Sequence, residues 1–170
     1  PDFNKGKLLQ AKNILAVVKF NSGLYEEGAA LFMEVIAGYE KNYGEDSSYL
    51  ASPLLNLGAY FYQKEEFTSA AIFYERAISI WEREGNDLET DILLWSSLAE
   101  TCLKLERYKD SKQAFEKLLP KLVQRDGRKS EAISFAKDRI KEVNKKLKKE
   151  KKIQKADRHQ QRGENKQMYE

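Results

Sequence analysis

The side chains that most often carry catalytic chemistry are sparse in this sequence. His159 is the single histidine of the 170 residues and Cys102 the single cysteine. One histidine excludes a multi-histidine metal site, and its place in a Lys-, Gln- and Arg-rich stretch argues against a histidine-based triad. Cys102 falls on an apolar helix face, where inert packing is expected rather than a reactive thiol. No glycine-rich phosphate loop occurs, and the acidic residues are spread over polar helix faces. We therefore expect no enzyme activity, no cofactor and no bound metal.

Composition predicts an all-helical protein. Hydrophobic residues make up 41% of the chain and charged residues 34%, with only three prolines and nine glycines. The apolar runs are a few residues long, too short to span a bilayer. A single cysteine fits a reducing compartment. An intracellular, cytoplasmic location is expected, although the Pro-Asp start looks trimmed and leaves organelle targeting open.

Charge divides the chain into two parts. Residues 1–136 hold 17 basic and 21 acidic side chains, a net charge of −4, whereas residues 137–170 hold 13 and 6, a net charge of +7. Such a break usually separates a folded domain from an extension. We place the boundary near Lys148, with a folded domain over 5–147 and a basic, frayed or disordered tail over 148–170.

Residues 54–81 predict two amphipathic helices joined by a tight turn. Apolar residues recur at helical spacing on both sides of a polar break at 63–66. A lone hairpin of this size cannot bury its apolar faces, so neighbours of the same kind are needed on both sides.

Two markers repeat with one period. The second helix of each expected hairpin opens with an aromatic residue 41 or 42 positions after the previous one: Tyr25, Phe67 and Tyr108. A glycine closes each hairpin with the same spacing: Gly44, Gly85 and Gly127. The period predicts three repeats, at about 8–44, 47–85 and 88–127.

Several local expectations follow. The first helix should run from about Lys5 to Phe20, and its apolar side should comprise Leu8, Leu9, Ile14, Leu15 and Val18. Pro53 should kink its helix or lie in the first turn of a helix capped by Ser52, and Pro120 should bend or end its helix after Leu119.

A seventh helix is expected over 130–147, with Ser130 as cap and Glu131 in the first turn. Its narrow apolar seam, which starts at Ile133 and ends at Leu147, suits a helix that caps the third repeat. A short coiled-coil or partner-binding seam is the alternative. The tail beyond it is either a solvated, fraying helix that ends by Gly163 or a basic arm for nucleic acid or acidic lipid surfaces.

The repeated residues resemble the tetratricopeptide repeat family. The second repeat meets every position of the family pattern, with Leu54, Leu57-Gly58, Phe67, Ala70, Tyr74 and Ala77. The third meets nearly all of them, and the first departs at Lys12, where a large apolar residue is usual. The repeat length of about 42 is similar to that of kinesin light chains. The resemblance covers roughly residues 8–127.

This resemblance implies a right-handed superhelix whose first helices line a concave groove that receives an extended or helical segment of a partner protein. Carried over by position, the lining comprises Asn13, Val17, Phe20, Leu55, Asn56, Ala59, Tyr62, Ser96, Ser97, Glu100 and Leu103. Asn56 is the leading candidate, because an amide can both donate to and accept from a peptide backbone. Packing between hairpins is the alternative role for each of these residues.

One kind of partner is disfavoured. Family members that clamp the acidic tails of heat-shock chaperones carry Lys, Asn and Arg at five groove positions, and of the matching residues here only Asn56 fits. Leu93 and Ser97 stand where cations are needed to pair a terminal carboxylate. A partner segment that is more apolar than acidic suits this lining better.

Taken together, the sequence predicts an all-α, right-handed superhelical array of three helical hairpins plus a C-terminal capping helix. The expected function is that of a non-catalytic adaptor, scaffold or assembly factor for another protein. The alternative is a protein associated with nucleic acid or an acidic surface through its basic tail. The partner's identity and the oligomeric state stay open.

Overall fold

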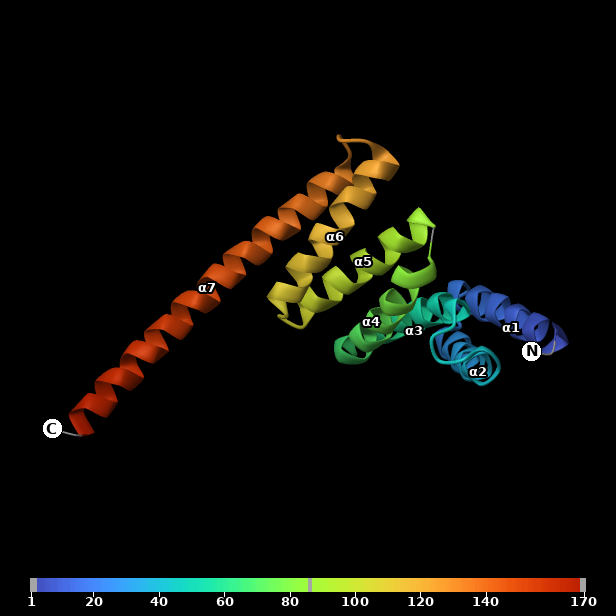
Figure 1. The fold of residues 1–170 in the computed structure, drawn as a ribbon, viewed down its shortest axis with the longest axis horizontal. Helices are drawn as coiled ribbons and strands as arrows, with labels where there is room; N and C mark the ends of the chain where they lie inside the picture. Colours follow the sequence, from blue (N-terminus) through green and yellow to red (C-terminus); the bar gives the residue numbers. More distant parts are fainter. Residues whose placement is uncertain (1–2, 86, 169–170) are drawn as a thin grey trace.

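The computed structural model describes the backbone of residues 3–85 and 87–168, and the side chains of 4–83, 85 and 87–158. This part of the chain forms helices and connecting turns (Figure 1). In order along the chain they are α1 (Phe3–Asn21), α2 (Tyr25–Tyr43), the 3₁₀ turn η1 (Ser48–Leu50), α3 (Ala51–Gln63), α4 (Phe67–Glu84), α5 (Leu88–Lys104), α6 (Tyr108–Asp126) and α7 (Glu131–Met168).

The helices pair as three antiparallel hairpins that stack side by side. Helix α1 packs on α2, α3 on α4 and α5 on α6, while α2 meets α3 and α4 meets α5 between the hairpins. The all-α hairpin array predicted from the 42-residue period is therefore confirmed. One continuous apolar core runs through it, from Ala16 in α1 to Ala136 in α7.

Small residues let the two helices of each hairpin approach closely. A Cβ added at Gly58 of α3 would lie 2.6 Å from the ring of Tyr74 in α4. Ala16 and Ala99 hold the equivalent positions of the other hairpins, and both are fully buried. In the third hairpin the buried Ser111 Oγ donates to the carbonyl of Ala99 at 2.9 Å.

The turn inside each hairpin uses the same backbone device. The residue two positions before the opening aromatic has positive φ in all three: 84° at Gly23, 60° at Glu65 and 57° at Glu106. This left-handed conformation lets the chain reverse within a few residues. Only the first repeat places a glycine there.

The two prolines behave differently. Pro53 lies in the first turn of α3, which confirms one of the two expected placements. The N-cap residue of this helix is Leu50, however, and not Ser52. Pro120 lies inside α6, which continues to Asp126. The expected end of the helix after Leu119 is therefore wrong, and the alternative of a bend there stays a prediction. The first turn of a helix tolerates proline because its N–H groups have no partner within the helix.

The expected apolar side of α1 is largely exposed. Leu8, Ile14, Leu15 and Val18 are 46–59% exposed, whereas Ala16 is fully buried and Leu9 packs against the core. The expected apolar side of this helix is therefore wrong, because the core lies on the face that carries Ala16. The reason is the position of α1 at the edge of the described array, with α2 covering only one of its sides (Figure 1).

Helix α7 packs against α6 through the predicted seam. Ile133, Ala136 and Val143 are buried, and Ser130 Oγ accepts the N–H of Ile133 at 3.2 Å, as expected of a cap. The helix does not end near Leu147 or Gly163 but continues to Met168, extending away from the hairpins (Figure 1). The division of the chain near Lys148 into a domain and a tail stays a prediction.

Candidate functional site: hollows between the repeats

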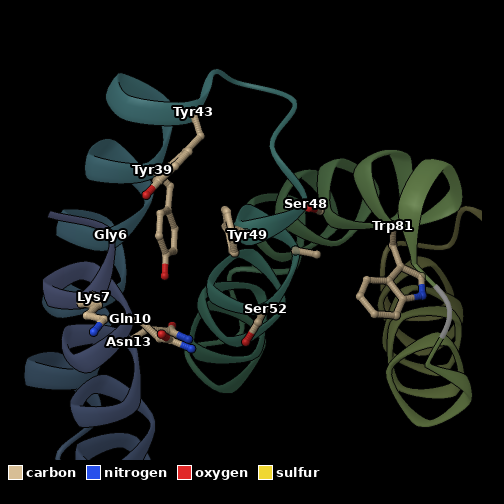
Figure 2. A pocket seen from close by; sticks show the side chains of 11 residues that line it. Gly6, Lys7, Gln10, Asn13, Tyr39, Tyr43, Ser48, Tyr49, Ser52 and Trp81 are labelled. Carbon is tan, nitrogen blue, oxygen red and sulfur yellow. The ribbon is translucent and has the colours of Figure 1, made fainter. Parts of the chain in front are cut away.

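The first hollow lies between the first two hairpins. It has a volume of about 430 Å³ and receives side chains from α1, α2, η1, α3 and α4 (Figure 2). Its lining comprises Gly6, Lys7, Gln10, Asn13, Tyr39, Tyr43, Ser48, Tyr49, Ala51, Ser52 and Trp81. We call this the tyrosine hollow, after the three tyrosines that form one wall.

The three tyrosines contact one another. Tyr39 and Tyr43 lie one turn apart on α2, and Tyr49 lies on η1. The ring of Tyr49 stacks on that of Tyr39 with centroids 5.4 Å apart and an interplanar angle of 25°, and it meets Tyr43 at 5.1 Å. Burial raises the pKa of Tyr39, and the nearby Tyr43 and Tyr49 hydroxyls add to the shift. The rings make the wall aromatic, and the raised pKa keeps the Tyr39 hydroxyl protonated at physiological pH.

Asn13 lies on the α1 side of this hollow (Figure 2). Its Oδ1 is buried and has no hydrogen-bond partner among the described residues. A buried acceptor of this kind costs about 1–3 kcal/mol unless a donor reaches it. The wall of the tyrosine hollow therefore includes an acceptor that no described group satisfies, and an incoming N–H or O–H group reaches it only if the Asn13 amide turns toward the hollow.

A second hollow lies between the second and third hairpins. It measures about 250 Å³ and is lined by Tyr62, Tyr74, Ser96, Ser97 and Glu100. Burial raises the pKa of Tyr74 to about 12, an effect that its hydrogen bond with Ser97 opposes. Burial also raises the pKa of Tyr62, with the nearby Glu100 charge as the next cause.

Glu100 links this second hollow to α7. Its Oε1 accepts from Arg139 Nε at 3.0 Å, and the Arg139 guanidinium also bonds Glu142. The Glu100 carboxylate is therefore already paired, so its charge is compensated rather than offered to a ligand. A third, more apolar hollow of about 450 Å³ lies beside it between α5, α6 and α7, where Phe135 is its most exposed aromatic side chain.

The eleven residues expected to line one groove are distributed over several surroundings. Asn13 lines the tyrosine hollow, while Tyr62, Ser96, Ser97 and Glu100 line the second. Several others pack partly buried against the core: Val17, Phe20 and Leu55. Ala59 and Leu103 are partly exposed and line none of the hollows described above. The role of all eleven residues in binding stays a prediction.

Asn56 is engaged by its own helix. Its Nδ2 donates to the carbonyl of Ser52 at 3.0 Å, one turn earlier in α3, and it lines none of these hollows. Such a local bond competes with any backbone of a partner. Among the two groove asparagines, Asn13 is the one that the structure leaves without a partner.

Sequence reasoning missed the aromatic wall of the tyrosine hollow. Tyr39, Tyr43 and Trp81 lie near the C-terminal ends of α2 and α4, and Tyr49 lies in the connection between hairpins. The length of the repeat could have pointed to them. A repeat of about 42 residues is longer than the ordinary 34, and three of these aromatic residues lie in or next to the additional residues of the first repeat. The pattern could not show that they turn toward α1.

Stacked antiparallel helix pairs with hollows between them define an α-helical repeat protein. A family model described as Tetratricopeptide repeat matches residues 7–83. These residues therefore form tetratricopeptide repeats, which confirms the resemblance seen in the sequence. The third hairpin, α5 with α6, lies beyond the matched residues and repeats the same architecture.

A solved structure shows the same fold. It is described as the crystal structure of BtubC (BKLC) from P. vanneervenii, and it superposes with a TM-score of 0.61 at 17% sequence identity. The alignment covers 84% of this chain and 61% of that one, so this chain spans about three-fifths of the length of its structural relative. At this identity the likeness concerns the fold alone. A search of curated protein sequences finds no match.

Two further findings concern the described residues. They contain no group of three or more His, Cys, Asp or Glu side chains placed to hold a metal ion. None of the helices in this part of the chain is both long and apolar enough to cross a membrane.

Proposed function

We propose that this protein is a non-catalytic adaptor or assembly scaffold that binds a segment of a partner protein in the tyrosine hollow. Tetratricopeptide repeats generally mediate protein–protein interactions. The observation that carries the proposal is Asn13 Oδ1, a buried acceptor without a partner, on the wall of a hollow of about 430 Å³. A backbone N–H of a bound peptide would satisfy it once the Asn13 amide turns toward the hollow.

The aromatic side chains of the tyrosine hollow support binding of an apolar or aromatic side chain. Rings of Tyr39 and Tyr49 are stacked on each other, so their orientation is held before a ligand arrives. Tyrosine and tryptophan provide large contact areas and lose little conformational entropy on binding. Trp81 faces the hollow from α4 (Figure 2). A partner segment would therefore place an apolar side chain between η1 and α4.

The lining of the hollow lacks the cluster of cations that strong recognition of an acidic segment needs. Among the residues that line it, Lys7 is the single cation. Recognition of a terminal carboxylate is strongest with two or more cationic donors in fixed geometry. A segment that is more apolar than acidic, with backbone N–H groups toward α1, suits the hollow best.

Selection from a displayed library of random 12-residue peptides tests this proposal. We expect selected peptides to be enriched in aromatic and aliphatic residues, and their binding to fall at least tenfold in the variants Asn13→Leu and Tyr49→Ala. Tenfold corresponds to about 1.4 kcal/mol, within the range for one hydrogen bond or one aromatic anchor. Affinity would be measured by fluorescence anisotropy of the selected peptide.

The matched control is Ile72→Ala. Ile72 is 60% exposed on α4 and lines none of the hollows, so its truncation should leave peptide affinity unchanged. Selected peptides that bind all three variants as tightly as the unmodified protein would show that the tyrosine hollow is not the site.

A further inference from the structure

Helix α7 carries a row of lysines along one face. Lys137, Lys141, Lys145, Lys148, Lys152 and Lys155 follow one another at spacings of 4, 4, 3, 4 and 3 residues, and all are exposed. At about 100° of rotation per residue, these six side chains fall within an arc of about 80°. With a rise of about 1.5 Å per residue, the row is about 27 Å long. We call it the lysine face.

Little negative charge lies on the lysine face. Asp138 stands at its edge and pairs with Lys141 at 2.9 Å, in a bridge whose two side chains are 74% and 66% exposed. Surface pairs of this kind are weak. Within the described side chains, Lys145, Lys148, Lys152 and Lys155 form no ion pair. The other acidic residues of this stretch, Glu142, Glu150 and Asp157, lie about 100–180° around the helix from Lys141.

The lysine face is held in place by the hairpin array. The apolar seam of α7, which contains Ile133, Ala136 and Val143, packs against the array and lies about 120° around the helix from the lysines. The helix then extends beyond the array (Figure 1). Residues 1–136 carry a net charge of −4, so the array itself would repel an anion that the extension attracts.

Lysines at i and i+4 repel each other, as Lys137 and Lys141 or Lys148 and Lys152 must do here. A ligand with regularly spaced negative charges would relieve this repulsion along the whole face. The phosphates of a nucleic-acid duplex form such a ligand, because one negative charge occurs about every 1.7 Å of the duplex axis. An α-helix with compact ammonium groups on one side can lie against them.

Two other polyanions fit less well. Between the lysines there are no aromatic side chains on which bases of a single strand could stack. The face has no apolar side chain to insert among lipids, and Ile153, which is 51% exposed, lies about 120° from Lys141. We propose that the lysine face of α7 binds the phosphate backbone of a double-stranded nucleic acid without sequence preference. This function is separate from peptide binding in the tyrosine hollow.

The test measures the binding of the full chain to a labelled 24-base-pair DNA duplex by fluorescence anisotropy at several salt concentrations. The logarithm of affinity should fall with the logarithm of salt with a slope of about −0.9 per phosphate contacted. If all six lysines make contact, affinity drops about 40-fold between 50 and 100 mM salt. The variant Lys145→Gln, Lys148→Gln, Lys152→Gln should bind more weakly, and its drop should shrink to about 6-fold.

A control variant removes the same charge elsewhere. Lys41, Lys109 and Arg128 are exposed, form no ion pair within the described side chains and lie off the lysine face. Their joint replacement by Gln should leave the salt slope unchanged. Circular dichroism checks that both triple variants keep their helices, and Asn13→Leu should bind the duplex normally, which separates this test from that of peptide binding.

Three results would overturn the proposal. The first is no binding to the duplex at 50 mM salt. The second is an equal loss of affinity in the control and lysine-face variants, which would indicate attraction to net charge alone. The third is tighter binding to a single strand of the same length, or to vesicles containing 30% anionic lipid, which would assign the lysine face to another class of polyanion.

Discussion

At the scale of single residues, two asparagines on the first helices of their hairpins have opposite surroundings. Asn56 donates its amide to Ser52 within α3, whereas Asn13 Oδ1 is buried without a partner beside the tyrosine hollow. Both were candidates for peptide binding because a side-chain amide can donate a hydrogen bond to a peptide carbonyl and accept one from a peptide N–H. Whether such an amide is available to a partner depends on two things. One is whether it bonds the carbonyl one turn earlier in its own helix, and the other is how the neighbouring hairpin surrounds it.

Cys102 provides a second test at this scale. It is fully buried in α5, and burial raises the pKa of its thiol to about 11. At pH 8 only about one thiol in a thousand would then be ionised. We expect 5,5′-dithiobis(2-nitrobenzoic acid) to leave Cys102 unmodified in the folded protein and to react rapidly once urea unfolds it.

The same shift has a consequence for stability at high pH. The folded state holds the thiol proton more tightly than the unfolded state, whose pKa is near 9. This contribution is fully present below pH 9 and is lost as pH rises toward 11, so the free energy of unfolding should decrease over that range. In Cys102→Ala this part of the decrease should disappear. Fast modification of folded protein at pH 8 would contradict the assignment of Cys102 as inert.

At the scale of elements, the three turns inside the hairpins solve one geometric problem with different residues. Each needs a left-handed residue two positions before the opening aromatic, and the chain uses Gly23 once and glutamate twice, at Glu65 and Glu106. Glutamate tolerates this conformation at some cost, and a β-branched residue tolerates it poorly.

Replacing Glu65 therefore has a predictable effect. Glu65→Val should lower the free energy of unfolding by about 1–3 kcal/mol, because valine is strained at a φ of 60°. Glu66→Val is the matched control, since Glu66 has an ordinary φ of −82° and is, like Glu65, exposed. Urea denaturation followed by circular dichroism compares the two. Equal losses would show that the cost comes from the removed charge and not from the backbone.

Helix α7 shows that one element can have two parts with different physical support. Up to about Leu147 its seam is buried against the array, and beyond that point its described side chains are almost all exposed. Charge and apolar content separate the two parts in the sequence, yet the backbone of the helix continues through both.

At the scale of the whole molecule, an array of repeats gives equivalent residues unequal surroundings. Leu15, Leu57 and Leu98 hold the same position in the three repeats. Leu57 and Leu98 are 1% and 9% exposed, because the preceding hairpin covers them, whereas Leu15 on α1 is 46% exposed.

This difference predicts unequal costs for the same substitution. Leu57→Ala should lower the free energy of unfolding by about 2–5 kcal/mol, whereas Leu15→Ala should cost less than about 1 kcal/mol. Thermal and urea unfolding of both variants would measure the difference. If Leu15→Ala proves as costly as Leu57→Ala, the α1 face must be covered in solution.

The sequence by itself determined the hairpins, their number within residues 8–127, the turns between their helices and the capping seam of α7. These features depend on spacings of 3 and 4 residues within a helix and of 41 or 42 between repeats, which are local properties of the chain. Tertiary structure alone decided which face of α1 is buried, which asparagine lacks a partner, and that Tyr39, Tyr49 and Trp81 share one hollow. Those outcomes depend on how neighbouring hairpins are rotated against one another, and helical periodicity does not encode that rotation.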